Sequence, residues 1–429
     1  MLKSIFTQIL NRKRSNSWIV AELSLVFILA WNITDYFFVI GYNYSIPNYR
    51  DIRHTWQVNL AEYPDVHPLY RSEENAGKAL EANFSRILQT IRNYPDIEAI
   101  SISERGSEPG SGGYHVRGFY SLNDTSHYEN GQAIRLDPQS DFFRVFGYTT
   151  NNGKTPVSTS DFDWSNPNGI VIGHSVAKRL FPDGLATGKE LTDGNKTQNY
   201  VVLGIVDDIK RFDYERTQNT FYLAFRCDSS NLRNVKISIR SKTSIPDASF
   251  KEAFKKEMTN SLQIGNFYLK SIVSYGKIAT DTKNSFGMTN EIRQRTYLMI
   301  FFLLNILLCV MGTFWYRIHT RREETGIRKA MGSTNRNIRN IFLIEGLCLL
   351  TIAMLPAMIV EANLVYAGLI ETLGRENLDT TYLPDRIFLR FLITNGITWV
   401  IMSAVIIAAI WLPARKAAAM PPAEALHYE

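Results

Sequence analysis

The segment of this chain that looks most like a chemical site is DGLATGKE, a loop at residues 183–190 with two glycines and a lysine. Phosphate-binding loops of the type G-x-x-x-x-G-K-[ST] place four residues between the glycines and a hydroxyl after the lysine, which helps to hold magnesium. Here Gly184 and Gly188 enclose only Leu-Ala-Thr, and Glu190 follows Lys189. The loop therefore predicts no nucleotide site.

Other reactive residues form no catalytic or metal-binding pattern. Asp207 and Asp208 are adjacent at the end of an expected strand, so their side chains point in different directions, and we expect a solvated turn. The histidines and cysteines lack metal-site spacing, the cysteines offer no disulfide framework, and no G-x-S-x-G elbow occurs. We therefore expect no catalytic, cofactor-binding or metal-binding residue. The side chains considered are His54, His67, His115, His127, His174, Cys227, Cys309 and Cys348.

Long apolar stretches divide the chain into membrane and soluble parts. A spanning helix needs roughly 20 apolar residues, and such helices are expected at 18–40, 297–318, 341–370 and 388–412. The first stretch follows a basic segment, as in a secretory signal, but it outruns the roughly 7 to 15 apolar residues of a signal and no A-x-A site follows. An uncleaved anchor is therefore expected.

Basic residues lie beside the apolar stretches, so the net charge of +6 indicates membrane orientation and not nucleic-acid binding. They occur in 1–17, around 319–340 and in 413–429, whereas the 371–387 connection is net acidic. We therefore expect both termini and 319–340 in the cytoplasm, and 41–296 outside. The basic residues are Lys3, Arg12, Lys13, Arg14, Arg317, Arg321, Arg322, Arg328, Lys329, Arg336, Arg339, Arg415 and Lys416.

Four carboxylates fall within the expected spans. Glu22 and Asp35 lie near the ends of the first span, and Glu345 and Glu361 lie near the ends of the third. Carboxylates inside spans are functional candidates by default, but from these positions we expect them to reach the membrane interface. Pro356 is expected to bend the third span, because proline removes a backbone donor.

The region 41–296 predicts a mixed α/β domain with a strand-rich insert, tied to the membrane at both ends. Amphipathic or apolar-patterned helices are expected at 72–92 and 250–262. The glycine-rich segment 107–113 is expected to be an exposed, flexible loop. Strands are expected at 97–103, 169–173, 200–206, 220–225 and 235–240.

The connection at 319–340 predicts an amphipathic helix suited to docking. Its apolar stripe would consist of Ile327, Ala330, Met331 and Ile338, while its arginines and lysines would face headgroups or an acidic partner. A solvated interfacial helix without a partner is the alternative that this pattern leaves open.

The stretch 317–350, RIHTRREETGIRKAMGSTNRNIRNIFLIEGLCLL, resembles the signature of MacB/FtsX-like permeases. That signature is a basic segment, then E-x-G-I-R-[KR]-A-x-G-[AS], then a span that begins near a glutamate. Residues 141–148, 169–191 and 414–429 resemble three further elements of the family. The matched signature residues are Glu324, Gly326, Ile327, Arg328, Lys329, Ala330, Gly332, Ser333 and Glu345.

The resemblance implies the permease subunit of an ABC transporter. Its fold would be four transmembrane helices with a mixed α/β extracytoplasmic domain, the MacB-like periplasmic core, inserted between helices 1 and 2. A separate cytoplasmic ATPase would bind ATP and Mg, with no cofactor in this chain. The ATPase-coupling residues would be Glu324, Gly326, Ile327, Arg328, Lys329, Ala330, Met331, Gly332 and Ser333.

The resemblance also implies a mechanism and a location. Two chains, identical or different, would pair in the lipid of the bacterial inner membrane, and nucleotide-driven closure would move the extracytoplasmic domains through rigid extensions of the first two spans, the second at 275–296. Export of a peptide, antibiotic, lipoprotein or similar cargo is the first interpretation. A regulator of a cell-envelope enzyme, or a membrane-anchored sensor, is the second, and an ectoenzyme is the third. A periplasmic adaptor or envelope protein is a further partner that the resemblance leaves open.

The charge pattern makes a topology prediction. A reporter fused after Glu429 or inserted within 320–340 should be cytoplasmic, and a cysteine at position 111 should react with an impermeant label on intact cells, because the basic flanks stay inside. Labelling at position 111 only after lysis would contradict four spans with this orientation.

Overall fold

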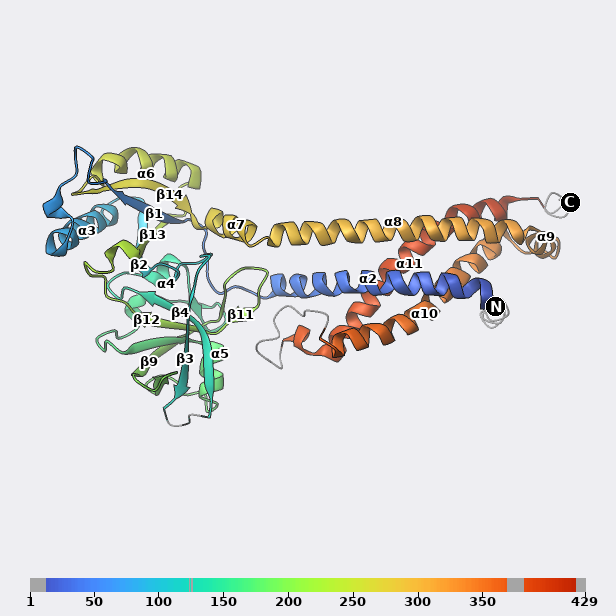
Figure 1. Cartoon of the computed structure of the whole chain (residues 1–429), viewed down its shortest axis with the longest axis horizontal. Helices are drawn as coiled ribbons and strands as arrows, with labels where there is room; N and C mark the ends of the chain where they lie inside the picture. The colour runs from blue at the N-terminus through green and yellow to red at the C-terminus, as the bar shows by residue number, and fades with distance from the viewer. Residues whose placement is uncertain (1–12, 123, 125, 369–381, 422–429) are drawn as a thin grey trace. The chain divides into compact units, whose positions relative to one another are not determined.

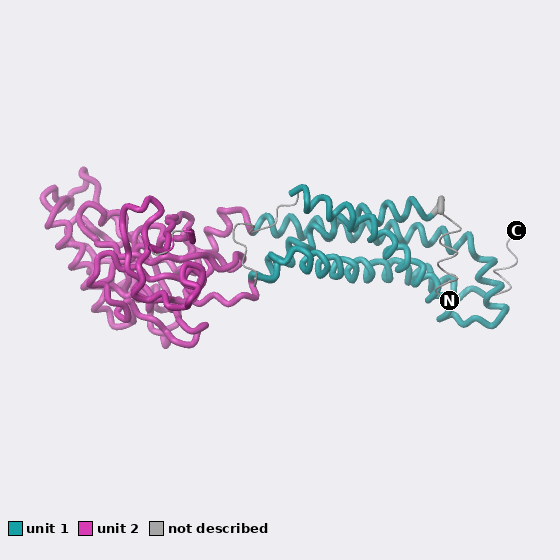
Figure 2. The backbone as a smooth tube through the Cα atoms, turned by 90° about the horizontal axis from the view of Figure 1, so that it is seen from below, with its two compact units in different colours: residues 1–43, 289–429 teal, residues 44–288 magenta. Residues whose placement is uncertain are grey.

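The computed structural model describes residues 13–122, 124, 126–368 and 382–421 of the chain. The chain divides into two compact units, coloured separately in Figure 2. One unit is Met1–Asn43 with Thr289–Glu429, and the other is Tyr44–Met288. We describe each unit by itself, as the helical unit and the α/β unit.

The helical unit contains four long helices, α2 (Lys13–Ser45), α8 (Met288–Thr320), α10 (Asn335–Tyr366) and α11 (Ile387–Ala419). Within the described residues, these four are long and apolar enough to cross a membrane. A helix satisfies its own backbone hydrogen bonds, which a bilayer core cannot do for other structures. The four expected spans are therefore confirmed as helices, but the third helix ends at Tyr366, and residues 369–370 of its expected range lie outside the described residues.

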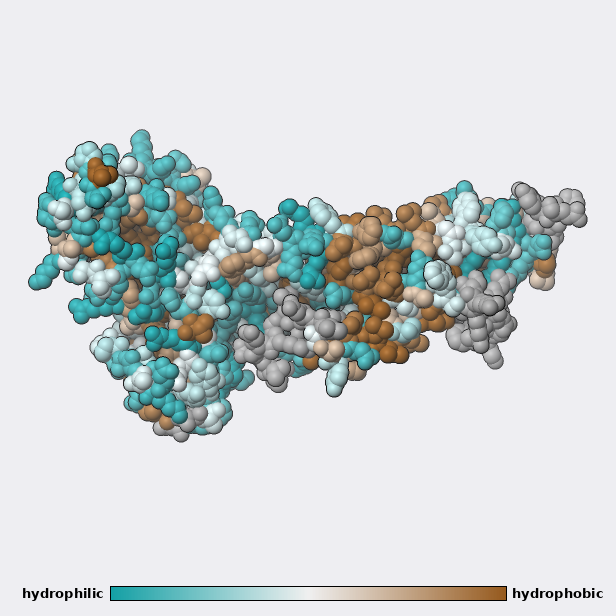
Figure 3. All heavy atoms as spheres, in the orientation of Figure 1, coloured by the Kyte–Doolittle hydropathy of each residue, from teal (hydrophilic) through white to brown (hydrophobic). Residues whose placement is uncertain are grey.

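Large apolar side chains fill the interior of the helical unit. Phe27, Trp31, Leu349 and Ile410 are almost wholly buried between the helices. Figure 3 shows a band of hydrophobic residues on the visible surface of this unit. Apolar side chains are favourable on such a surface where lipid replaces water. Exposed members on α8 include Leu298, Ile300, Phe301, Leu304 and Leu308.

One half of the α/β unit is an antiparallel sheet in the order β2-β13-β1-β14. Helices α3 (Gly77–Arg92) and α6 (Asp247–Ser261) pack on this sheet (Figure 1), with Ile87 and Phe254 buried against Trp56 and Ile239. The strands are β1 (Thr55–Glu62), β2 (Ile97–Glu104), β13 (Val235–Ser241) and β14 (Phe267–Ser274).

The strand-rich insert is a closed ring of six strands. Its order is β4-β12-β7-β9-β8-β3, and β3 pairs with β4 to complete the circle. Closure leaves no unpaired edge within the ring, and Phe119, Ile170, Val202 and Phe221 fill its interior. The strands are β3 (His115–Ser121), β4 (Tyr128–Leu136), β7 (Gly169–Gly173), β8 (Glu190–Asp193), β9 (Asn199–Val206) and β12 (Thr220–Ala224).

Short elements complete the α/β unit. They are α4 (Phe142–Val145), α5 (His174–Leu180), α7 (Tyr275–Ser285), the 3-10 turns η1 (Ser72–Glu74), η2 (Thr159–Asp161) and η3 (Leu232–Asn234), and the strands β5 (Thr149–Thr150), β6 (Thr155–Pro156), β10 (Ile209–Lys210) and β11 (Thr217–Gln218). In the helical unit, η4 (Leu383–Asp385) precedes α11. The helix expected at 72–92 thus starts later, at Gly77, after a separate turn.

Two loop and linker predictions were wrong. Residues 107–110 of the expected exposed loop 107–113 are buried, because the Glu108 carboxylate accepts a hydrogen bond from the backbone N–H of Gly106 (2.8 Å) and Ser107 Oγ accepts one from the backbone N–H of Arg135 (2.9 Å), whereas Gly112 and Gly113 are exposed. The expected rigid extension over 275–296 is interrupted between α7 and α8. Gly287 there has a φ of +76°, which L side chains rarely adopt.

The expected solvated turn at Asp207 and Asp208 is also wrong. Asp207 is 4% exposed, and its carboxylate accepts hydrogen bonds from the N–H groups of Asn152 (3.0 Å) and Gly153 (2.8 Å). Asp208 accepts two bonds from the Ser175 N–H (3.0 and 3.1 Å), and burial raises the pKa of its carboxyl. The two carboxylates therefore hold different segments: Asp207 binds the turn at 152–153, and Asp208 binds the first turn of α5.

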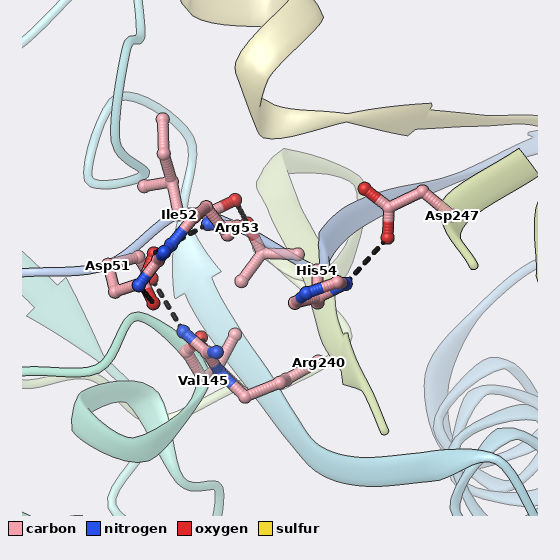
Figure 4. A network of polar contacts seen from close by, with 8 residues as sticks. Asp51, Ile52, Arg53, His54, Val145, Arg240 and Asp247 are labelled. Atoms are coloured by element: carbon pink, nitrogen blue, oxygen red, sulfur yellow. Dashed lines mark hydrogen bonds and ion pairs between the residues drawn. The ribbon is translucent and has the colours of Figure 1, made fainter. Parts of the chain in front are cut away.

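A polar network fixes the segment between α2 and β1 (Figure 4). The buried Arg240 donates to the backbone carbonyls of Val145 (2.8 Å) and Asp51 (2.6 Å). His54 is paired with Asp247 at 2.7 Å. Arg240 thus joins strand β13, helix α4 and the start of the unit through one side chain.

Replacing Arg240 by leucine should loosen this junction, because two carbonyls lose their donor. We expect a loss of about 2–3 kcal/mol in local opening free energy, or roughly 30- to 150-fold faster amide exchange in β1 and β13. Hydrogen exchange of the intact chain measures this. The control Arg53→Leu removes a side chain that is 83% exposed, and should leave amide exchange in β1 and β13 close to that of the wild type. Equal exchange in both variants would show that Arg240 does not hold the junction.

Candidate functional site

The predicted coupling segment is a short helix between two turns. Helix α9 runs from Arg322 to Ala330, and α10 begins at Asn335, so the structure divides the expected 319–340 helix. Acidic Glu323 and Glu324 occupy the first turn of α9 and basic Arg328 and Lys329 the last, which matches the helix dipole. Arg328 also pairs with Glu324 at 2.8 Å.

A glycine cap ends α9. Gly332 has a φ of +92°, and the Gly332 N–H donates to the Lys329 carbonyl (2.9 Å) while the Ser333 N–H donates to the Arg328 carbonyl (3.0 Å). These two bonds form a Schellman motif, which favours glycine at the left-handed position. No atom lies within 4 Å of the place where a Cβ would stand at this residue. Gly332 is therefore explained by the helix end and not by close packing.

Helix α9 has an inner and an outer face. Thr325 and Gly326 are buried against the helical unit. Ile327 is 50% exposed and Met331 is 74% exposed, and Ala330 is exposed beside them. We call Ile327, Ala330 and Met331 the apolar strip. Ile338, predicted to join the strip, is instead buried in the core of the helical unit at 2% exposure, because α10 has already begun there.

An ion triad fixes the helices on either side of α9. Glu345 on α10 accepts from Arg317 Nη1 (3.1 Å) and from Arg321 Nη1 (2.8 Å), and Arg317 also binds Asn16 on α2. Glu345 is 4% exposed and the two arginines are 7–8% exposed. The expectation that Glu345 reaches the interface was therefore wrong. A buried charge of this kind is tolerated only with good partners.

Further bonds hold the inner face of α9. Thr325 Oγ1 donates to the Arg321 carbonyl (3.0 Å), and Lys329 Nζ donates to the Met420 carbonyl (2.7 Å), just past the end of α11. Lys329 thus ties α9 to α11. Of the family-like segment 414–429, residues 422–429 lie outside the described residues.

The nine predicted coupling residues form one continuous element, but with different roles. The apolar strip is exposed, Gly326 is buried, and Gly332 and Ser333 form the cap. Sequence reasoning missed the triad arginines as positioning residues. The signal was present, because Arg317, Arg321 and Glu345 lie within or beside spans, where charges need partners.

A second ion pair lies elsewhere in the helical unit. Asp35 on α2 is 5% exposed and binds Arg390 on α11 through both carboxylate oxygens, one at 2.8 Å. Next to this pair, Trp31 Nε1 donates to Thr394 Oγ1 (2.9 Å). The expectation that Asp35 and Glu361 reach the interface was wrong, since Glu361 is wholly buried. Glu22 is half-buried in a groove lined by Asn305, Cys309 and Thr313.

The described residues contain no group of three or more histidine, cysteine, aspartate or glutamate side chains that would hold a metal ion. The feature of the site is instead the exposed apolar strip of α9, a helix whose two neighbours are joined by the ion pairs of Glu345.

Two protein-family models match the chain. The FtsX-like permease C-terminal model matches residues 297–422, which contain most of α8 and all of α9 to α11, and the MacB-like periplasmic core domain model matches residues 53–255. The chain belongs to the MacB/FtsX-like permeases. These proteins are permease components of ABC transporters, so the chain is a multi-pass membrane protein with a MacB-like α/β domain after its first span.

Solved structures were also compared with this MacB/FtsX-like permease. A permease domain from Porphyromonas gingivalis has 12% identity and TM-score 0.31, covering 52% of this chain and 90% of that one. The periplasmic region of MacB from Actinobacillus actinomycetemcomitans has 14% identity and TM-score 0.31, covering 55% and 94%. The extracellular domain of the transporter YknZ from Gram-positive bacteria has 14% identity and TM-score 0.28, covering 50% and 100%. A comparison with curated proteins found no match. The assignment rests on the two family models.

Changing Glu345 to glutamine should lower the local stability of α9. Removing one charge of the buried triad leaves two arginines without a full counter-ion, at a cost of about 3–5 kcal/mol. We expect amide exchange in α9 and the first turns of α10 to rise at least about 100-fold in lipid nanodiscs.

Glu291→Gln is the matched control, because its partner Arg295 lies four residues away and both side chains are 33–42% exposed. This variant should change the opening free energy measured by amide exchange in α9 by less than about 0.5 kcal/mol. Unchanged exchange in α9 of the Glu345 variant would refute the positioning role of the triad.

Proposed function

We propose that this permease carries no catalytic activity of its own and couples a separate cytoplasmic ATPase to movement of its α/β domain. The observation that carries the proposal is the apolar strip of α9, exposed on a helix that is held by the Glu345 triad, by Lys329 and by the Gly332 cap. Exposed apolar side chains on a fixed helix are the usual anchors of helix-in-groove recognition. The strip is therefore the ATPase-docking surface.

The orientation follows from charge. The arginines and lysines around α9 and the basic segment before α2 support an orientation in which both termini and α9 lie on the cytoplasmic side of a bacterial inner membrane. The α/β domain then lies in the periplasm or at the cell exterior. The ATPase meets α9 on the cytoplasmic side, where it binds ATP and Mg, and this chain needs no cofactor.

The composition of the strip suits docking to a partner surface. Ile327 and Met331 offer apolar area, and the flexible side chain of methionine adapts to an irregular groove. Arg328 is half-buried beside them and pairs with Glu324, so it can also meet an acidic rim of the partner. Rim charges contribute mainly to the rate and specificity of association.

Motion is transmitted through chain connections. Pulling α9 moves α8 and α10 together, because Arg317 and Arg321 of the α8 end are bound to Glu345 of α10. The α8 helix continues through the Gly287 break into α7 and β14, and α2 leads to the segment held by Arg240. Within the described helices, Asp35, Arg317, Arg321, Glu345 and Arg390 are paired with one another and so supply no charged lining for a channel.

Two identical or different permease chains form the working complex, with lipid around their spans. Export of a peptide, antibiotic, lipoprotein or similar cargo is the function we favour. Control of a cell-envelope enzyme by the same motion is the second candidate, supported by the match to the FtsX-like permease model. A periplasmic adaptor or envelope partner would receive the motion in either case.

Variants of the strip test the docking. Met331→Asp should leave insertion intact and weaken ATPase binding by roughly 10- to 100-fold, since buried interface anchors contribute about 2 kcal/mol or more. Arg328→Glu should also leave insertion intact and should weaken recovery of the ATPase, because it sets a like charge against the acidic rim of the partner. Gly332→Trp should do the same by straining the cap, whereas Gly332→Asn should retain binding, because asparagine tolerates a positive φ. Co-purification of the ATPase from membranes measures the effect.

Val66→Asp is the matched surface control. Val66 is 87% exposed in the α/β unit, and its replacement should leave ATPase recovery unchanged. Wild-type recovery of the ATPase with both Met331→Asp and Arg328→Glu would refute docking through the strip.

A further inference from the structure

Glu361 on α10 is a buried carboxyl group that forms no ion pair with the described residues. The residue is 0% exposed, and within the described part of the chain neither of its carboxyl oxygens has a hydrogen-bond partner. Glu345, on the same helix, binds two arginines. An ionised carboxylate in an apolar interior is very unfavourable unless it is paired, and such a group normally becomes neutral instead.

The groups that face Glu361 do not supply a positive charge. Asn395 on α11 lies close to the Glu361 carboxyl but makes no hydrogen bond of normal geometry to it, and the Asp35 carboxylate on α2 is close enough to interact with it electrostatically. Asp35 is itself acidic and therefore supplies no counter-ion for Glu361. Arg390 on α11 is bound to both carboxylate oxygens of Asp35, so its positive charge neutralises Asp35 and not Glu361.

The other buried arginines of the helical unit are bound far along the helix. Arg317 and Arg321 meet α10 at Glu345, which lies about 24 Å from Glu361 at roughly 1.5 Å per residue. Pairing with a described arginine therefore does not account for Glu361.

The side-chain oxygen of Asn395 lacks a hydrogen-bond donor among the described residues. The Asn395 Nδ2 donates to the Phe391 carbonyl (3.0 Å), while the buried Oδ1 accepts no hydrogen bond from the described residues. The bond to Phe391 fixes the amide orientation, because a flipped amide would bring two oxygens together. A hydroxyl hydrogen on Glu361 would supply the donor that Oδ1 lacks.

We propose that Glu361 is a proton-binding site of the helical unit, at which the carboxyl keeps its proton while α2, α10 and α11 are packed together and releases it to water when they separate. The packed state is the one in which Ser24 Oγ of α2 donates to the Ala353 carbonyl of α10 (2.8 Å) and Trp31 of α2 donates to Thr394 of α11. This inference does not depend on docking to the ATPase.

The release step conserves charge. Water that enters between the helices accepts the proton from the Glu361 O–H, the electron pair of that bond stays on the carboxyl oxygen, and the carboxylate is solvated. Repacking requires the uptake of one proton. Since the packed state binds the extra proton, packing is favoured at low pH and weakens as pH rises.

Infrared spectroscopy of the intact chain in lipid nanodiscs at neutral pH tests the proton directly. The wild type should show a C=O stretching band of a protonated carboxyl that is lost in Glu361→Gln and retained in Glu252→Gln, which changes an exposed carboxylate of α6. A carboxyl band that is identical in wild type and Glu361→Gln would overturn the proposal.

Thermal stability as a function of pH gives an independent readout. Glutamine is a neutral analogue that can also donate to Asn395 Oδ1, so Glu361→Gln should match the wild-type Tm at neutral pH. It should then lose less stability than the wild type as pH becomes alkaline, while Glu252→Gln should follow the wild type. Equal losses in wild type and Glu361→Gln would contradict the proposal. Stabilisation of the wild type by sodium ions, absent in Glu361→Gln, would also overturn it, because the free oxygens would then hold a metal cation.

Discussion

The salt bridges of Glu345 are the interaction on which the proposed coupling depends. Arg317 in the last turn of α8 and Arg321 just before α9 carry two positive charges that water barely reaches, and Glu345 on α10 pairs with both. Because each of these charges is costly to bury alone, the two salt bridges form together and break together. Helix α9 lies between these two anchored helices, so its position follows from theirs.

The same principle explains how the helical unit combines charge with apolar helices. Asp35 and Arg390 neutralise one another between α2 and α11, as the triad does between α8 and α10. Trp31 and Thr394 extend that contact by a hydrogen bond. Charged side chains thus specify which helices meet, while apolar side chains such as Phe27 and Leu349 supply the packing. The strip on α9 is free to face a partner because other groups fix the helix.

Much of the architecture was predictable, and the failures have common causes. Hydropathy located four spans, and alternation located β7, β9, β12 and β13, because both patterns are local. Burial of the 107–110 segment, Asp207 and Asp35 was not predictable, because it depends on distant partners such as Arg135, Gly153 and Arg390. Closure of the six-stranded ring likewise rests on the pairing of β12 with β4, which lie far apart in the sequence.

The coupling segment shows the same division. Its residues and its apolar strip were recognisable from the signature, but the end of α9 at Gly332 moves Ile338 into the next helix and the core. Site-specific photo-crosslinking in cells most directly tests whether the strip meets an ATPase. A photoreactive residue at Met331 should capture the ATPase, and one at Val66 should not. Capture of the ATPase from position 66, or none from position 331 in active complexes, would contradict the account.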